Sequence, residues 1–217
     1  MNKQVVYSPS WLRVTLLCMG LLTATMFQIM PAVAEETAAT GRNSDLDRAR
    51  TLYKQALQSA SQSQDDGSNP QTIVDLFTEA ANLGYAPAQV DLGQIYYYGL
   101  AGMRDDNQAV FWFQKAAEQG DAKGQYLLGR MYTEGKGGLQ ESESQALIWY
   151  EKAAAQGYDP AQYYLAILYL AGIDGIEKDR NKAVDLLQKA AKQGNKEAHE
   201  LLIKLQLSQA IPQPSQK

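Results

Sequence analysis

The chain carries four copies of one short string, Ala-Ala-x-x-Gly. The closing residues of the copies are Gly84, Gly120, Gly157 and Gly194, which stand 36, 37 and 37 residues apart. A near-constant period of this length is typical of stacked helix pairs, in which each pair buries its apolar face only against its neighbours. The sequence therefore predicts an all-α fold, an α-solenoid of stacked antiparallel helix pairs.

Helical spacing on both sides of each glycine supports this prediction. Eight residues after each glycine stands a leucine: Leu92, Leu128, Leu165 and Leu202. Four residues later come Tyr96, Tyr132 and Tyr169, with Gln206 in the last partial copy. A second apolar stripe follows, with Ala109, Trp112 and Ala116 in its first copy. Spacings of three and four are the helical period, so each unit is predicted to be helix A, a glycine-bearing turn, helix B and a glycine stop.

Small and large residues alternate in a way that suits close helix packing. Gly93, Gly129 and Ala166 follow the repeat leucine and would let two helices approach closely. Trp112 and Trp149 are expected to fill the gap between neighbouring pairs.

Helix ends are also marked. Asp105, Ser142 and Asp179 precede helix B, where a short oxygen-bearing side chain can accept from a free backbone N–H. The glycines after helix B are predicted to adopt the left-handed conformation that closes a helix.

The repeat resembles the Sel-one-like repeat (SLR) family, relatives of the tetratricopeptide repeat with a longer turn between the helices. The pattern AxxWxxKAAxxGxxxAQxxLGxxYxxG is met by Ala109, Trp112, Lys115, Ala116, Ala117, Gly120, Gln125, Leu128, Gly129, Tyr132 and Gly135, and again one repeat later. The resemblance covers about residues 71–205 and implies an SLR/TPR-like superhelix. Ala166, Leu186 and Gln206 depart from the pattern.

The expected boundaries follow from the repeat and its flanks. They are a signal peptide (1–34), a flexible leader (35–44), an N-terminal helical cap with a degenerate half-repeat (45–83), three repeats (84–120, 121–157 and 158–194), a C-terminal capping helix (195–207) and a disordered tail (208–217).

The N-terminal segment has the features of a secretory signal. Lys3 and Arg13 precede a mostly apolar run, and small residues lead to a cleavage site between Ala34 and Glu35. We therefore expect an exported, periplasmic protein without stable membrane insertion after cleavage. An uncleaved inner-membrane anchor and full secretion are the alternatives, although the run is short for a spanning helix. Cys18 belongs to the signal, because Leu17 is too large for a lipobox.

The net charge disfavours one class of partner, and the cysteine content excludes disulfides and thiolate metal sites. Cleavage removes two basic residues and no acidic one, which takes the formal net charge from −4 to −6. This balance disfavours a nucleic-acid partner. Because Cys18 is the only cysteine, the mature chain has no disulfide and no thiolate metal site.

Catalytic residues are sparse. His199 is the only histidine, and it occupies the repeat position of Gln89, Gln125 and Gln162. The resemblance admits β-lactam hydrolysis as an alternative, yet no serine after residue 34 has a lysine three places later. We therefore expect no catalytic residues, no cofactor and no metal site.

Recognition of a protein or peptide partner remains. By the family resemblance, helix A lines a concave groove through positions on either side of the repeat leucine and one turn beyond. These residues are Val90, Gln94, Tyr97, Tyr126, Arg130, Thr133, Tyr163, Ile167 and Leu170. The sequence thus favours an exported, non-catalytic adaptor in cell-envelope assembly or signalling. An envelope hydrolase acting on peptidoglycan or β-lactams, and a membrane-anchored structural component, are the alternatives.

Overall fold

The structure is a computed structural model that describes residues 41, 43–62 and 69–210. The predicted signal peptide, its cleavage site at Ala34 and Glu35, and residues 211–217 lie outside the described residues. The chain divides into two units, residues 1–47 and 48–217. In the first unit residues 43–47 are helical, and Ser44 Oγ donates a hydrogen bond to the Gly41 carbonyl.

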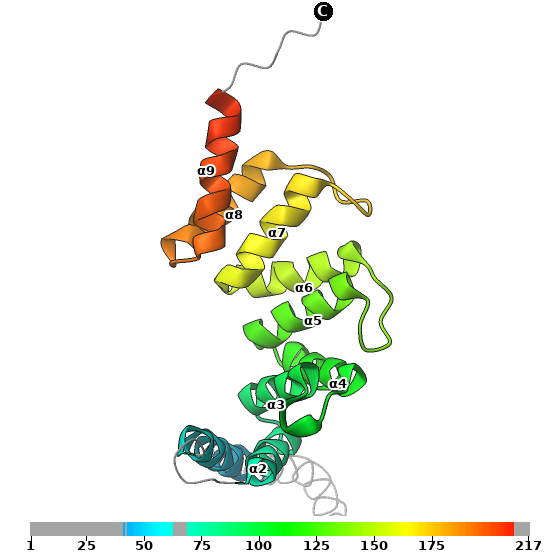
Figure 1. The fold of residues 1–217 in the computed structure, drawn as a ribbon, viewed down its shortest axis with the longest axis vertical. Helices are drawn as coiled ribbons and strands as arrows, with labels where there is room; N and C mark the ends of the chain where they lie inside the picture. The colour runs from blue at the N-terminus through cyan, green and yellow to red at the C-terminus, as the bar shows by residue number, and fades with distance from the viewer. Residues whose placement is uncertain (1–40, 42, 63–68, 211–217) are drawn as a thin grey trace, which may run out of the picture. The chain divides into compact units, whose positions relative to one another are not determined.

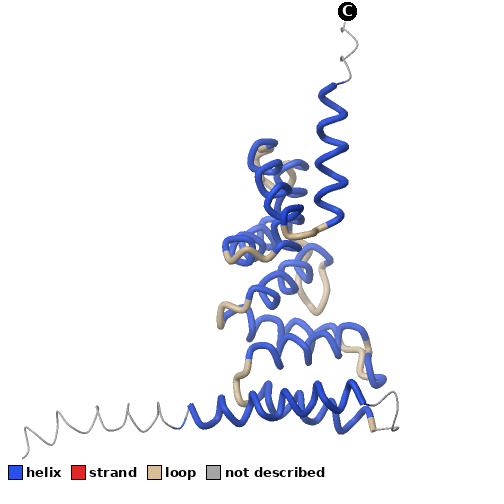
Figure 2. The backbone as a smooth tube through the Cα atoms, turned by 90° about the vertical axis from the view of Figure 1, so that its left-hand side faces the viewer, coloured by secondary structure: helices blue, strands red, loops and turns tan. Residues whose placement is uncertain are grey.

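The second unit is a series of helices that pack on one another in chain order (Figure 1). Residues 48–62 form its first helical segment. It is followed by α2 (Pro70–Asn82), α3 (Ala86–Tyr98), a 3-10 turn (Leu100–Gly102), α4 (Asp106–Glu118), α5 (Ala122–Glu134), α6 (Glu143–Ala155), α7 (Asp159–Ala171), α8 (Arg180–Lys192) and α9 (Lys196–Ala210). The described residues contain helices and loops and no strand (Figure 2). The predicted all-α solenoid is confirmed.

Close packing between helix A and the next helix B depends on a small–large pair. A Cβ atom at Gly93 would lie 2.5 Å from the ring of Phe113, and one at Gly129 would lie 2.7 Å from the ring of Tyr150. The third repeat has Ala166 and Leu187 at these positions, both 0% exposed and in one core cluster. A smaller side chain on helix B thus accompanies the larger one on helix A.

Trp149 packs against the core cluster of α3, α4 and α5, in the gap between neighbouring pairs as expected, but Tyr150 rather than Trp149 is the fully buried aromatic residue of α6. Trp149 is only partly buried, with Lys152 Nζ 3.8 Å from its ring centroid, whereas Tyr150 is 0% exposed. Successive helical residues are about 100° apart, so only one of the two can face Gly129. Trp112 is 7% exposed and does belong to the core.

Helix B begins and ends as predicted. Asp105, Ser142 and Asp179 each accept a hydrogen bond from a backbone N–H in the first turn of the helix that follows. Gly120, which follows α4, has φ +89°, a conformation that side-chain-bearing residues rarely adopt.

The C-terminal helix is longer than predicted. α9 extends to Ala210, whereas a helix ending at residue 207 was expected. The next proline after α9 begins is Pro212, and it disfavours helical conformation at the residue before it, which is consistent with a helix that ends at Ala210.

Buried glutamines connect successive repeats. Gln89, Gln125 and Gln162 are at most 5% exposed. Each donates to a backbone carbonyl eight residues earlier and accepts from the glutamine that directly follows the next helix B, as in Gln125 to Ala117 (3.3 Å) and Gln156 to Gln125 (2.9 Å). His199 takes this position on α9, where it is exposed. In the other copies, the glutamine at this repeat position therefore stabilises the packing of successive repeats.

Candidate functional site

The nine predicted binding residues lie on the helix A elements α3, α5 and α7. Val90 is 2% exposed and packs in the core cluster that contains Phe113, so it cannot contact a partner. The other eight are partly buried: Gln94, Tyr97, Tyr126, Arg130, Thr133, Tyr163, Ile167 and Leu170. Val90 and Leu92 are both buried because α3 is packed on two sides, with Leu92 in one core cluster and Val90 in the next.

A charged cluster is formed by one residue of α3, two residues of α5 and one residue of the turn after α5. These residues are Tyr97, Arg130, Glu134 and Lys136. Glu134 accepts hydrogen bonds from the Tyr97 hydroxyl (2.8 Å) and Arg130 (2.7 Å), and it pairs with Lys136 (2.6 Å). Arg130 and Lys136 also donate to the Tyr97 hydroxyl oxygen and lie over its ring. With two cations and one carboxylate, the cluster has a formal charge of about +1.

Electrostatics hold this cluster in one ionisation state. Partial burial alone would raise the pKa of Glu134, but hydrogen bonds from Lys136, Arg130 and Tyr97 outweigh it and lower the pKa to about 2. Burial opposes the charge of Arg130, yet Glu134 raises its pKa above the ordinary value. The three charges therefore persist at neutral pH.

The charged cluster should weaken in acid. The folded pKa of Glu134 lies below its ordinary value of 4.5, so its stabilisation is complete above that value and is lost as pH falls towards 2. After discounting for solvent screening, we expect a loss of about 1–2 kcal/mol. Chemical denaturation between pH 6 and 2.5 measures it. Glu134→Gln should remove this part of the pH dependence, and an unchanged pH profile would show that the carboxylate is not coupled to folding.

Five tyrosines of α5, α6, α7 and the α6–α7 turn form a tyrosine cluster: Tyr126, Tyr150, Tyr158, Tyr163 and Tyr164. The ring of Tyr126 lies 5.4 Å from Tyr158 and 5.7 Å from Tyr164, and Tyr150 stacks with Tyr164 at 5.8 Å. Tyr150 is the buried base of the cluster, whereas Tyr164 is 37% exposed. Burial raises the pKa of Tyr126 and Tyr150, so both phenols remain protonated.

The two clusters are continuous. Tyr126 and Arg130 are four residues apart on α5 and so lie on the same helix face. Burial raises the pKa of Tyr126, and the positive charge of Arg130 opposes this rise. We call the accessible part of both clusters the A-helix surface, which consists of Tyr97, Tyr126, Arg130, Lys136, Tyr163 and Tyr164.

Sequence reasoning missed several members of these clusters. Glu134 stands four residues after Arg130, a helical ion-pair spacing that could have identified it. Tyr164 lies beside the predicted Tyr163, but no repeat position pointed to it. Lys136 lies in a turn, so helical spacing gave no signal. Of the predicted set, Tyr163 and Leu170 also pack against the last core cluster.

The chemistry of this surface is recognition rather than catalysis. Phenol hydroxyls, ring faces and a guanidinium offer hydrogen bonds and large contact area. Within the described residues, no group of three or more histidine, cysteine, aspartate or glutamate side chains could hold a metal ion. Over the same residues, no helix has the length and apolar character needed to cross a membrane.

Comparison with known families follows the repeat. A family model for the Sel1 repeat matches residues 86–121, 122–158 and 159–195. The chain belongs to the Sel1 repeat family. Proteins of this family are typically non-catalytic scaffolds, and members take part in protein–protein interactions. Each matched segment of this Sel1 repeat protein begins at or within a residue of the start of a helix A element.

Two curated relatives share part of the Sel1 region. One is the ERAD-associated E3 ubiquitin-protein ligase component HRD3A of Arabidopsis thaliana, 41% identical over 58 residues. The other is chitin synthase regulatory factor 3 of Schizosaccharomyces pombe, 34% identical over 73 residues. The aligned segments are 26% and 33% of this chain but only 9% and 8% of those relatives.

Solved structures share the fold over a longer span. A protective antigen of uropathogenic Escherichia coli strains that displays an SLR fold superposes with a TM-score of 0.67 at 29% identity, covering 74% of this chain and 34% of that one. A Sel1 repeat protein from Oxalobacter formigenes superposes with a TM-score of 0.65 at 28% identity, covering 72% and 62%.

Proposed function

We propose that this Sel1 repeat protein is an exported, non-catalytic adaptor that binds a protein or peptide partner through its A-helix surface. The observation that carries the proposal is the tyrosine cluster. Tyr164 is 37% exposed while the Tyr150 ring beneath it is fully buried. A rigid buried base under an accessible ring suits an interface anchor, because less side-chain entropy is lost on binding.

The charged cluster gives the same surface a polar edge. Arg130 is held in place by Glu134 and Tyr97 and still lies beside the tyrosines. Arginine and tyrosine are the side chains enriched among residues that dominate binding energy. The scaffold-type fold and the interaction roles of Sel1 relatives support this reading.

A photo-crosslinking experiment tests the surface. We expect a benzoylphenylalanine residue placed at position 164 to capture a partner covalently in cells of the source organism. The same group at Phe111 is the control, because Phe111 is 47% exposed but lies on helix B. Capture at Phe111 with none at position 164 would place the interface on the opposite helices.

We place the adaptor in the cell envelope, with the periplasm as its compartment. This part rests on the sequence before Glu35. We expect the mature protein to begin at Glu35 and to leave the cell with the soluble periplasmic fraction, which N-terminal sequencing of that fraction checks. Protein that retains Met1 in carbonate-washed membranes would favour the anchored structural component.

An envelope hydrolase is the remaining alternative. A hydrolase with a Ser–His mechanism would have to use His199, the only histidine. His199→Gln restores the residue found at this position in the other repeats, so the adaptor should tolerate it. Hydrolysis of peptidoglycan or a β-lactam that this substitution abolishes would favour the enzyme.

A further inference from the structure

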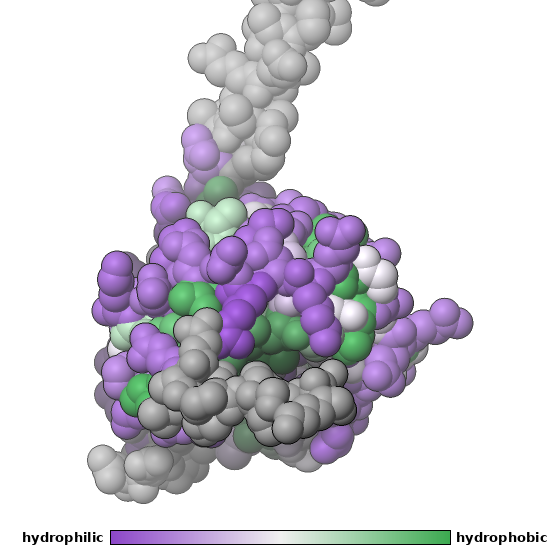
Figure 3. Space-filling model, turned by 90° about the horizontal axis from the view of Figure 1, so that it is seen from above, coloured by the Kyte–Doolittle hydropathy of each residue, from purple (hydrophilic) through white to green (hydrophobic). Residues whose placement is uncertain are grey.

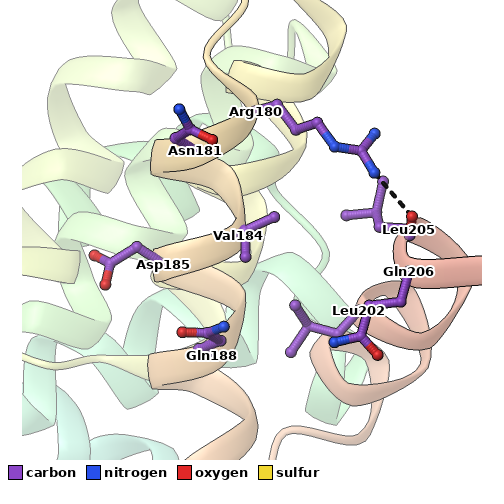
Figure 4. Close-up of a pocket in the computed structure, with 8 residues that line it drawn as sticks. All are labelled: Arg180, Asn181, Val184, Asp185, Gln188, Leu202, Leu205 and Gln206. Atoms are coloured by element: carbon purple, nitrogen blue, oxygen red, sulfur yellow. Dashed lines mark hydrogen bonds between the residues drawn. The ribbon is translucent and has the colours of Figure 1, made fainter. Parts of the chain in front are cut away.

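A cavity of about 350 Å³ lies between α8 and α9, at the end of the described stack (Figure 4). Its walls are Arg180, Asn181, Val184, Asp185 and Gln188 from α8, and Leu202, Leu205 and Gln206 from α9. Val184 points towards α9, and Leu202 points back towards α8 (Figure 4). The volume is at the lower end of the range of about 300–1,000 Å³ for ligand pockets.

The same space one repeat earlier is occupied by a tyrosine. α6 and α7 begin 37 residues before α8 and α9, so Tyr169 corresponds to Gln206. Tyr169 packs in one core cluster with Leu147, the counterpart of Val184. Its hydroxyl donates to Glu151 (2.9 Å), the counterpart of Gln188.

The α8–α9 cavity differs from its counterpart in lacking this aromatic ring, since a cavity of about 310 Å³ in the earlier repeat is lined by Leu147 and by Tyr169 itself. Tyr96, Tyr132 and Tyr169 each pack against two successive core clusters. Gln206 is exposed and carries a shorter amide in place of the ring. The counterpart of the hydrogen-bond acceptor is retained, since the Gln188 side-chain carbonyl can accept from a hydroxyl as Glu151 does.

We propose that this cavity binds a tyrosine side chain supplied by a partner protein or peptide. The apolar walls formed by Val184, Leu202 and Leu205 would enclose the ring, and Gln188 would accept from its hydroxyl. Residues 207–217 contain no phenylalanine, tyrosine or tryptophan. The site is separate from the A-helix surface and holds whether or not that surface binds a partner.

A hydrogen bond beside the cavity connects the two helices that form its walls. Arg180 Nη2 donates to the Leu205 carbonyl on α9 (2.8 Å; dashed in Figure 4). This bond joins the first turn of α8 to α9 beside the cavity. Seen from above, hydrophobic side chains lie between hydrophilic ones on the molecular surface (Figure 3). Polar residues around an apolar slot suit a ring with a polar tip rather than a fully apolar side chain.

Titration with N-acetyl-L-tyrosinamide tests the site in the full mature chain. We expect saturable shifts of the backbone amide resonances of Val184, Leu202 and Gln206, with a dissociation constant in the range of about millimolar for so small a ligand. Intermolecular contacts should connect the ring protons with the methyl groups of Val184 and Leu202. N-acetyl-L-leucinamide should bind at least about tenfold more weakly.

Gln206→Tyr is the decisive variant, because it restores the residue of the other repeats and fills the slot. It should weaken binding of the tyrosine probe at least about tenfold while leaving the protein folded. Gln145→Tyr, on the exposed face of α6, should leave binding unchanged. The proposal is overturned if the probe gives no saturable shifts or ring contacts, if the leucine analogue binds equally well, or if binding survives Gln206→Tyr.

Discussion

Tyr150→Ala should lower the free energy of unfolding by about 3–5 kcal/mol. The Tyr150 side chain is 0% exposed, and its ring occupies the space left by the missing side chain of Gly129. It also supports the rings of Tyr126 and Tyr164. Truncation leaves a cavity between α5 and α6 that backbone glycine cannot fill. Urea denaturation of the mature protein measures the effect.

The neighbouring tryptophan is the matched control. Trp149→Ala removes a larger side chain, but one that is only partly buried beneath Lys152. We expect it to cost about 1–2 kcal/mol. A cost for Trp149→Ala that equals or exceeds that of Tyr150→Ala would contradict the small–large pairing of helix A with helix B.

Repetition made the fold predictable from the sequence. Any single copy could be a helix pair by chance, but the glycines, the leucines and the capping residues recur in one period. The ends of helix B were predictable for a local reason, since Asp105 and Ser142 bond to backbone within three residues.

The side chains that fill the core were harder to predict. Tryptophan is the larger residue and was assigned to the gap, yet the helix rotates Tyr150 rather than Trp149 towards Gly129. The prediction that Val90 binds a partner is wrong for a related reason. The position two residues before the repeat leucine is predicted to be on the surface, but Val90 faces the core. A shift of one residue along a helix turns a side chain by about 100° and can move it from the surface to the core. A family pattern does not specify this rotation.

The candidate site was half predictable. Tyr97, Tyr126 and Arg130 came from positions that repeat, and the structure places all three together. Glu134 and Lys136 hold Tyr97 and Arg130 in place. Both bond to Tyr97, which lies 37 and 39 residues earlier in the chain. Such contacts follow from how the repeats stack, which spacing along one helix does not describe.

Loss of partner binding is the second large effect. The double variant Tyr164→Ala/Arg130→Gln removes the exposed ring and the guanidinium but leaves the buried Tyr150 and the Lys136–Glu134 pair in place. It is preferable to truncating Tyr126, whose ring packs against three others and two core clusters. Two anchors of about 2 kcal/mol each make a loss of at least about 30-fold in affinity a conservative expectation.

The dissociation constant of the partner captured at position 164 tests the central claim most directly. It should be measured by calorimetry for the mature protein, for Tyr164→Ala/Arg130→Gln, and for Phe111→Ala/Lys115→Gln, which removes an exposed ring and its stacked cation from helix B. The account predicts a weakening of at least about 30-fold for the first variant, less than about twofold for the second, and similar melting temperatures for both. Unchanged affinity in the first variant, or an equal loss in both, would contradict binding through the A-helix surface.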